Sequence, residues 1–422
     1  MVNLTQQLSY QQQTLFFENV SIQKLAEKIG TPFYCYSQRA IVDNIKQCQT
    51  AFSDPRFHIH YALKANSNLS ILKIVAAQNL SADIVSIGEM QRALLAGFSS
   101  QQIIFSGVGK TSSEIQQAMQ QGVGQFNIES AEELELLIQL AADANHTVNA
   151  MIRVNPEVSI STHKNITTGA KGNKFGVRLD QVLKMLHSAK NTQVKIQGLA
   201  MHIGSQIQQT TPYLAAIDKL LLHIEMFKTE GFILNNIDLG GGFGISYGQE
   251  KSLTFTQFSD VIMQKLKDWK GKIYIEPGRS IIADAGLLIT PITYIKHAEP
   301  RPFVILEAAM NDLMRPALYQ AIHPIITVAQ KQGEQQYDVV GPVCESTDTF
   351  EKKAKLPALL TPGELVCFLY AGAYCAVMSN SYNSRNIISE VLVNGEEASC
   401  IRTAIKQQDL LQFETQPYQL LS

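Results

Sequence analysis

Two stretches of the sequence place groups suited to binding an aldehyde and a phosphate directly after short apolar runs. Lys64 follows Tyr61-Ala62-Leu63, and a lysine that is partly removed from water there would be a nucleophilic amine. Residues 238–244 form a glycine-rich turn, Asp-Leu-Gly-Gly-Gly-Phe-Gly, whose bare backbone N–H groups can converge on a phosphate. A solvated lysine and an ordinary tight turn are the alternatives that these two patterns leave open.

Two further stretches suit a flat ring that carries a positive charge. Glu276-Pro277-Gly278-Arg279 combines an acid able to pair with a ring nitrogen and an arginine able to bind a carboxylate or a phosphate. His202 lies in Met-His-Ile-Gly-Ser and could stack on the ring, with a core histidine as the alternative. A lysine, a phosphate-binding turn, an acid and a stacking partner are the groups that pyridoxal phosphate requires. The sequence therefore predicts a site for this cofactor.

Eight short apolar runs, with helix-like segments between them, indicate how these residues are positioned. The runs are 58–63, 82–86, 103–107, 125–129, 149–154, 198–203, 236–240 and 273–276. Alternation of strand and helix predicts a parallel sheet. Eight such units predict an α/β fold with a (β/α)8 barrel, and a doubly wound open sheet is the alternative. Barrel enzymes carry their chemistry at the C-terminal ends of the strands, where Lys64, His202 and Glu276 fall.

After about residue 281 the pattern changes to strands separated by proline and glycine turns. The expected strands are 287–295, 303–306, 337–340, 365–369, 387–393 and 410–414, and only 312–328 is expected to be mainly helical. We therefore expect a barrel at 36–280 followed by a mostly antiparallel β domain at 281–422. The N-terminal segment, 1–35, is expected to pack with the β domain, to which residues 33–35 would add a strand.

Composition argues against several classes of protein. Among 422 residues, 35 basic and 37 acidic ones leave a net charge of −2, which argues against a nucleic-acid binder. No apolar run approaches the roughly 18 residues of a membrane-spanning helix, and the N-terminus lacks the pattern of a signal peptide. Six scattered cysteines without metal-binding spacing predict free thiols in a reducing cytoplasm and no metal site.

Several longer motifs, taken in order, resemble the fold-type III pyridoxal-phosphate decarboxylases, which implies an alanine racemase-like barrel followed by a β-barrel domain. These motifs are 61–66, 105–110, 173–176, 202–206 and 276–279. Three further stretches, 308–319, 340–346 and 382–385, resemble the diaminopimelate decarboxylase family within that group.

The resemblance implies a role for each site residue. Lys64 would bond to the cofactor aldehyde, and Cys344 would deliver the proton that replaces carbon dioxide. The cofactor would be held by Lys64, His202, Ser205, Gly240, Gly241, Gly242, Glu276, Pro277, Gly278, Arg279 and Tyr374. The distal end of the substrate would be bound by Arg279, Arg315, Tyr319, Glu345 and Tyr374. The family further implies a homodimer in which Cys344 and Glu345 reach into the partner's site.

The implied reaction removes carbon dioxide from the D-centre of meso-2,6-diaminopimelate and gives L-lysine, the last step of lysine biosynthesis. The second amino-acid end of this substrate must be recognised. A guanidinium binds a carboxylate bidentately and a carboxylate binds an ammonium, so Arg315 and Glu345 suit that end. Cys344 suits the role of an acid because an unperturbed thiol, with a pKa near about 8.5, stays protonated at neutral pH.

Alternatives to this assignment remain on the sequence alone. A relative acting on carboxynorspermidine, ornithine or arginine would have less use for Arg315, and a non-catalytic protein on the same fold would not need Lys64. Cys344 could be a buried structural cysteine. Four positions depart from the family's usual pattern, where aspartate, glycine, glycine and leucine are expected: Glu307, Thr347, Cys375 and Phe243.

Overall fold

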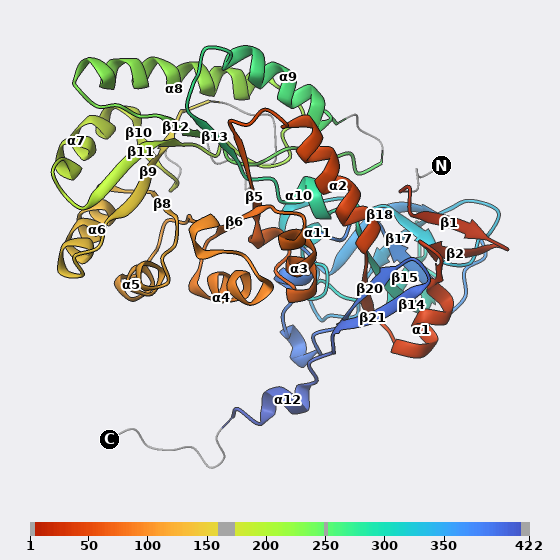
Figure 1. Ribbon diagram of the computed structural model, residues 1–422. Helices are drawn as coiled ribbons and strands as arrows, with labels where there is room; N and C mark the ends of the chain where they lie inside the picture. Colours follow the sequence, from red (N-terminus) through yellow and green to blue (C-terminus); the bar gives the residue numbers. More distant parts are fainter. Residues whose placement is uncertain (1–4, 159–173, 249–251, 415–422) are drawn as a thin grey trace. The chain divides into compact units, whose positions relative to one another are not determined.

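The computed structural model describes residues 5–158, 174–248 and 252–414, shown in Figure 1. The chain divides into two compact units. One contains the described residues of Val42–Ser246 and Glu250–Ile281, and the other contains those of Met1–Ile41, Tyr247–Gln249 and Ile282–Ser422. Asn173, which begins one of the motifs above, lies outside the described residues.

The first unit is built on eight parallel strands. They are β5 (Phe57–Ala62), β6 (Ser81–Ile84), β7 (Ile103–Phe105), β8 (Gln125–Ile128), β9 (Val148–Asn155), β11 (Val194–Ala200), β12 (Asn236–Asp238) and β13 (Lys272–Ile275). The hydrogen-bonded order β9-β11-β12-β13-β5-β6-β7-β8 returns to β9, so the sheet is closed. The short strand β10 (Val177–Arg178) pairs with β9 outside this ring. The predicted barrel is confirmed, and the open sheet is excluded.

Helices connect the barrel strands, as Figure 1 shows. They are α3 (Leu69–Ala77), α4 (Ile87–Ala96), α5 (Ser112–Gln120), α6 (Ala131–Asp143), α7 (Leu179–Ala189), α8 (Thr211–Thr229) and α9 (Phe255–Lys265). Before the first barrel strand comes α2 (Gln38–Ala51), and after the last comes α10 (Arg279–Ile282). In α6 the buried residues include Leu134, Leu137 and Ala141, and this spacing of three to four places them on one face. Thr111 and Glu114 form a capping box that starts α5.

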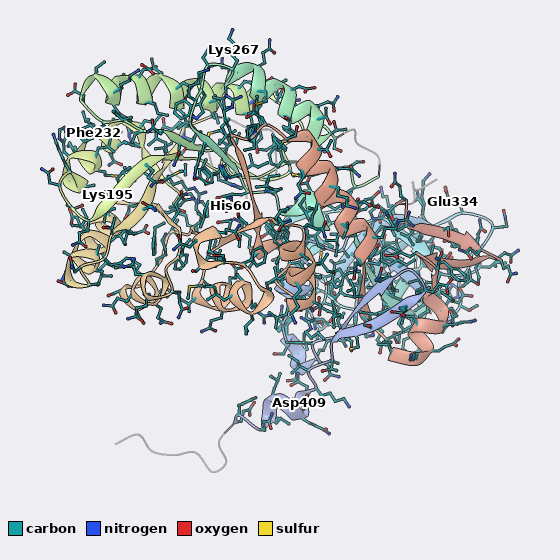
Figure 2. All side chains as sticks on the ribbon, in the orientation of Figure 1. His60, Lys195, Phe232, Lys267, Glu334 and Asp409 are labelled. Atoms are coloured by element: carbon teal, nitrogen blue, oxygen red, sulfur yellow. The ribbon has the colours of Figure 1, made fainter. Side chains whose placement is uncertain are left out.

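Apolar side chains from several strands fill the barrel. Ile104, Met151, Ala200 and Tyr274 form one buried cluster. His60, labelled in Figure 2, is also buried on β5. Burial lowers the pKa of His60 to about 4, so its ring is neutral at pH 7 and packs as part of the core.

The second unit contains a mixed, mostly antiparallel sheet. Its strands are β4 (Phe33–Ser37), β14 (Gly286–Lys296), β15 (Phe303–Leu306), β16 (Ile325–Thr327), β17 (Gln335–Val340), β18 (Thr349–Leu356), β19 (Leu365–Phe368), β20 (Ser389–Asn394) and β21 (Glu397–Arg402). The main path runs β18-β17-β15-β14-β4-β20-β21, and β19 joins β14 to β16. Among the described strands of this sheet, only β15–β17 and β4–β20 pair in parallel. The predicted β domain and the strand at 33–35 are confirmed.

The N-terminal residues of this unit add elements that the sequence pattern does not predict. A three-stranded sheet contains β1 (Leu8–Gln11), β2 (Thr14–Phe17) and β3 (Val20–Ser21). It is followed by α1 (Ile22–Ile29), which begins at Ser21 because that side chain accepts from the Lys24 N–H.

Two local predictions are wrong. The expected strand at 410–414 is occupied by α12 (Gln407–Leu411), which begins where Asp409 accepts from the Lys406 N–H. The expected helical segment 312–328 contains only the single turn α11 (Arg315–Tyr319). That turn stops at Gln320, whose φ is 54°, and the chain then enters β16.

Within the described ranges, no helix is long and apolar enough to cross a membrane. The same ranges hold no group of three or more His, Cys, Asp or Glu side chains arranged for a metal ion. All six cysteines are described, and none of them forms a disulfide. Cys344 and Cys400 are exposed, and the other four are buried.

Candidate active site

Lys64 lies directly after β5, in the short helix η1 (Leu63–Ala65). Its ammonium donates to Asp83 Oδ2 at 3.1 Å, from the neighbouring strand β6. Asp83 is fully buried, whereas 34% of the Lys64 side chain is exposed. Asp83 Oδ1 has no hydrogen-bond partner among the described residues. Lys64 is thus held by a buried acid and is still accessible to a ligand.

Asp238 and Glu276 form a buried pair of hydrogen-bonded carboxyl groups at the ends of β12 and β13. Asp238 also accepts from the Gly240 N–H at 2.8 Å and from the Asn127 amide at 3.2 Å. Burial, together with Asp238 and Asp83, raises the pKa of Glu276 well above its usual value. Two carboxyl groups can share a hydrogen bond only when one is protonated. Because Asp238 accepts two other donors, the shared proton belongs on Glu276.

His202 lies just beyond β11 and faces the same acids. Its Nδ1 accepts from the Gly241 N–H at 3.1 Å and lies 4.0 Å from Glu276 Oε2. Burial, followed by the nearby Lys64 and Arg153 charges, lowers the pKa of His202 well below its usual value. The ring is therefore neutral, with its hydrogen on Nε2.

The glycine turn after β12 packs tightly against its neighbours. A Cβ atom at Gly240, Gly241 or Gly242 would overlap the carbonyl oxygen of Met201, Glu276 or Gly204, respectively. Tyr213, from α8, donates its hydroxyl to the Gly241 carbonyl. Glycine is therefore required here by close backbone approach, and at Gly240 and Gly242 also by positive φ values of 67° and 92°.

Gly278 and Arg279 begin α10 beside Lys64. A Cβ at Gly278 would lie 3.0 Å from that of Ala65. Arg279 is buried and its Nη2 donates to Ser205 Oγ at 3.0 Å. The buried Oγ of Ser280 has no partner among the described residues. An arginine next to two hydroxyl groups forms a donor set that suits a phosphate.

The structure thus brings the predicted barrel residues together at the C-terminal ends of the strands. Lys64, Asp83, His202, Glu276 and the glycine turn interact with one another.

A buried lysine that has no predicted role supports this cluster from beside β7. The side chain of Lys110 is 1% exposed and pairs with Glu133 at 2.7 Å. Its ammonium also donates to the carbonyl oxygens of Gly107 and Asn127 at 2.7 and 2.9 Å. The Asn127 amide in turn donates to Ser106 Oγ and to Asp238. Lys110 therefore fixes the residue that supports the acid pair.

In the second unit, Arg315 and Tyr319 lie at the two ends of α11. Arg315 is 6% exposed. Its guanidinium carbon lies 5.2 Å from the centre of the Tyr247 ring, and its Nη1 lies 2.8 Å from His323 Nε2. No ion pair of Arg315 with a carboxylate occurs within the described part of the chain. A buried guanidinium without an acid is suited to a carboxylate from outside the chain.

Cys344 and Glu345 follow β17 in an exposed loop, so Cys344 is not a buried structural cysteine. The Cys344 N–H donates to Asn383 Oδ1 at 3.0 Å. Buried Asp348 accepts from the Val343 N–H at 2.7 Å. These two contacts fix the backbone on either side of the predicted acid.

Tyr374 follows β19 and has a φ of 56°, a left-handed conformation that is uncommon outside glycine. Cys375, one of the departures noted above, is buried, and its Sγ lies 3.2 Å from the Ala373 carbonyl oxygen.

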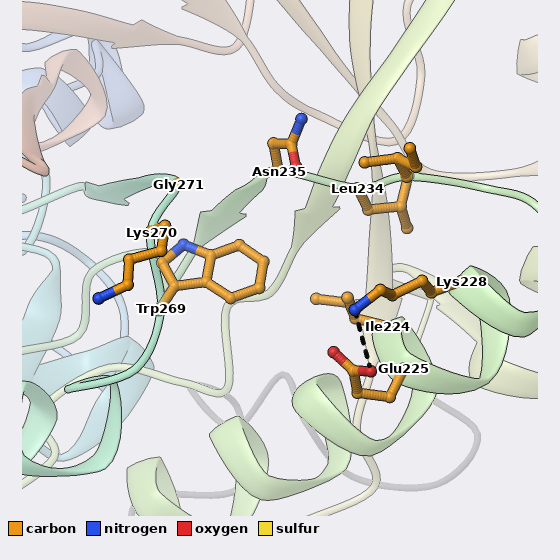
Figure 3. Close-up of a pocket in the computed structure, with 9 residues that line it drawn as sticks. Ile224, Glu225, Lys228, Leu234, Asn235, Trp269, Lys270 and Gly271 are labelled. Carbon is orange, nitrogen blue, oxygen red and sulfur yellow. Dashed lines mark ion pairs between the residues drawn. The ribbon is translucent and has the colours of Figure 1, made fainter.

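A cavity of about 180 Å³ lies at the opposite ends of the barrel strands, before β12 and β13. It is lined by Ile224, Glu225, Lys228, Ile233, Leu234, Asn235, Trp269, Lys270 and Gly271. Figure 3 shows the ion pair between Glu225 and Lys228, which spans 3.6 Å. No predicted site residue lines this cavity.

Comparison with known proteins identifies the family. The family described as "Pyridoxal-dependent decarboxylase, pyridoxal binding domain" matches residues 38–283. The diaminopimelate decarboxylase of Neisseria meningitidis serogroup A is 41% identical over 391 residues, 92% of this chain and 96% of that protein. The chain belongs to the diaminopimelate decarboxylase family. The resemblance predicted from its motifs, the decarboxylase class and the pyridoxal cofactor are thereby confirmed.

Solved members of the diaminopimelate decarboxylase family share the fold. The enzyme of Helicobacter pylori, solved with L-lysine, is 39% identical with a TM-score of 0.89, covering 92% of this chain and 98% of that one. The diaminopimelate decarboxylase of M. jannaschi is 32% identical with a TM-score of 0.92, covering 97% of this chain and 98% of that one.

Sequence reasoning missed four supporting residues: Lys110, Asn127, Tyr213 and His323. Lys110 lies in a family-like motif, but its contacts depend on strands far apart in the chain. Only its position after the apolar run 103–107 could have indicated a buried role.

Proposed function

We propose that this chain decarboxylates meso-2,6-diaminopimelate to L-lysine and carbon dioxide, the last step of lysine biosynthesis. The observation that carries the proposal is the cluster of Lys64, Asp83, His202, Asp238 and Glu276 within the matched pyridoxal-binding segment. The names of the relatives support diaminopimelate as the substrate, and L-lysine bound to the Helicobacter pylori relative fits the expected product.

Pyridoxal phosphate, when bound, supplies an electron sink that stabilises negative charge at the substrate Cα as carbon dioxide leaves. The residues present fit this group. Lys64 offers an accessible amine beside a buried acid. Glu276 holds a proton that it would share with the ring nitrogen, and the neutral His202 ring would stack on the cofactor face.

The phosphate would be bound at the glycine turn and at the start of α10. Gly240–Gly242 would offer backbone N–H groups, while Arg279 and Ser205 would donate from side chains. The Ser280 hydroxyl, which has no hydrogen-bond partner among the described residues, supports an anion at this place. Pro277 and Gly278 would shape the loop, and Tyr374 would donate to the phosphate from the second unit.

The distal end of the substrate would be recognised by charge. Arg315 would bind the distal carboxylate together with Tyr319 and Arg279, because it is buried without an acidic partner among the described residues. Glu345 would accept from the distal ammonium, and Tyr374 would contact the same end. Ornithine and arginine lack a second carboxylate and would leave the Arg315 charge unpaired.

Cys344 would complete the reaction as a general acid. Its thiol proton would pass to Cα, so that a C–H bond replaces the C–C bond lost with carbon dioxide. The loop contacts to Asn383 and Asp348 would hold the sulfur in place. Exposure of Cys344 supports a role at an interface, because Cys344 and Glu345 would reach into the site of a second subunit of a homodimer.

The same proposal places the enzyme in the cytoplasm, where free thiols persist. It assigns residues 36–280 to the cofactor-binding barrel and 281–422 to the β domain, with segment 1–35 packed on the latter.

The test uses purified protein loaded with pyridoxal phosphate. Offered meso-diaminopimelate, carboxynorspermidine, ornithine and arginine separately, it should release carbon dioxide and L-lysine from the first. Borohydride should trap the cofactor on the Lys64 peptide, and Lys64→Ala should abolish both trapping and turnover. Lys73→Ala, an exposed lysine of α3, is the matched control. Preference for an amino acid without a second carboxylate would refute the substrate, and trapping on another lysine would refute Lys64.

A further inference from the structure

We propose that His323 is a positioning residue that aims Arg315 at the distal carboxylate of the substrate; this rests on the proposed role of Arg315. Both residues are buried in the second unit, with 2% and 6% exposure. His323 Nε2 lies 2.8 Å from Arg315 Nη1, and His323 Nδ1 lies 3.0 Å from the Leu369 carbonyl oxygen.

These two contacts determine the state of the histidine. A guanidinium can only donate, so Nε2 of His323 must accept. A carbonyl oxygen can only accept, so Nδ1 must carry the hydrogen. His323 is therefore held as the neutral tautomer that offers one acceptor to Arg315. The anchor at Leu369 fixes the direction of that acceptor.

An aromatic ring holds the same pair from another side. Tyr247 lies 5.2 Å from the guanidinium carbon of Arg315 and 5.5 Å from the His323 ring, which it meets edge to face. Tyr370 packs on Tyr247 at 5.6 Å. Arg315 also hydrogen-bonds the side chains of Tyr247 and Cys375. The guanidinium is thus restricted in direction by several neighbours.

Because His323 is neutral, it does not compensate the positive charge of Arg315 as an acidic side chain would. Arg315 Nε remains buried without a hydrogen-bond partner among the described residues. A carboxylate in place of His323 would pair with the guanidinium and compete with the substrate. The neutral ring orients the guanidinium and leaves its positive charge for the ligand, which preorganises the site for an anion.

The test measures binding of two ligands to the holoenzyme. L-Lysine keeps the distal carboxylate of diaminopimelate, whereas cadaverine has lost it. His323→Leu should weaken L-lysine binding by about tenfold, the effect of losing one charge-assisted hydrogen bond, and leave cadaverine binding unchanged. The KM for diaminopimelate should rise more than kcat falls. His323→Gln, which keeps an acceptor and a donor, should recover part of the affinity, and His146→Leu, at an exposed histidine, should change nothing.

A double-mutant cycle separates positioning from a merely structural role. If His323 acts through Arg315, then His323→Leu should cost no further affinity for L-lysine in an Arg315→Leu background. Additive losses, or equal losses for L-lysine and cadaverine, would overturn the proposal. If His323→Leu does not fold, His323→Asp keeps the test open: its carboxylate should pair with the guanidinium and raise the KM for diaminopimelate, and an unchanged KM would overturn the proposal as well. Undiminished L-lysine binding by Arg315→Leu alone would instead refute the proposed role of Arg315.

Discussion

Lys110→Met should destabilise the barrel severely, because it removes the only cation that the described residues place against Glu133. The side chains of Lys110 and Glu133 are 1% and 9% exposed. Methionine fills a similar volume but leaves the buried Glu133 carboxylate without its cation, with only the Glu129 N–H still donating to it. The carbonyl oxygens of Gly107 and Asn127 also lose their donor. Breaking a buried pair from one side costs about 3–5 kcal/mol, which is the expected loss in the free energy of unfolding.

The assay is urea unfolding followed by the fluorescence of Trp269, the one tryptophan in the sequence, which lies in the barrel unit. The free energy of unfolding in water comes from linear extrapolation. Lys267→Met is the control, because Lys267 is exposed and labelled on the surface in Figure 2, and its free energy of unfolding should change by less than about 0.5 kcal/mol.

Two further measurements test the physical reason. The double variant Lys110→Met/Glu133→Leu removes both charges and should recover at least half of the loss, since a buried pair replaced by apolar groups is often neutral. Burial raises the pKa of Glu133, so its protonation should make the loss in Lys110→Met smaller at pH 5 than at pH 8. A loss below about 1 kcal/mol, or a double variant less stable than the single one, would refute the reasoning.

Three other outcomes are expected. Gly241→Ala should lower the free energy of unfolding by about 1–3 kcal/mol through overpacking and weaken cofactor binding. Gly109→Ala, where a Cβ meets nothing within 4 Å, should do neither. Equal effects of the two substitutions would contradict the close packing described for the glycine turn. Lys64→Ala and Cys344→Ala, refolded together, should regain roughly a quarter of wild-type activity if the site is shared between subunits, and no recovery in confirmed mixed dimers would exclude sharing. Burial raises the pKa of Glu89 from 4.5 to about 7, so the folded state keeps a proton that the unfolded state releases, and stability falls as pH rises through this window. Glu89→Gln should therefore gain about 1–3 kcal/mol at pH 8 relative to pH 4, and a gain independent of pH, measured by thermal unfolding, would contradict this assignment.

The barrel could be predicted from the sequence because its strands are short apolar runs separated by amphipathic helices. For example, the predicted strands 58–63 and 273–276 begin and end within one residue of β5 (Phe57–Ala62) and β13 (Lys272–Ile275). Lys64 and Glu276 could be assigned to one site for the same reason, since parallel strands bring their C-terminal ends together.

The β domain was less predictable because its local sequence and its long-range pairing disagree. Residues 312–328 are rich in helix-forming types, yet the left-handed Gln320 stops α11 after one turn and β16 pairs with β19. His323 could not be assigned to Arg315 and Leu369 from the sequence, because these two partners lie in segments about 50 residues apart in the chain, before and after several strands.

The position of β4 has a consequence for synthesis on the ribosome. Tyr36 pairs with Gly286 on one side of the sheet, and Phe33 pairs with Ser389 on the other. At about 5–20 residues per second, β4 emerges roughly 20 to 70 seconds before its second partner exists. All eight barrel strands are complete before that moment, so the barrel can fold co-translationally while Phe33–Ser37, fully buried in the native sheet, still lacks its β20 neighbour. A nascent chain stalled before residue 389 should therefore hold a folded barrel and leave the β20-facing edge of β4 unpaired and open to chaperones.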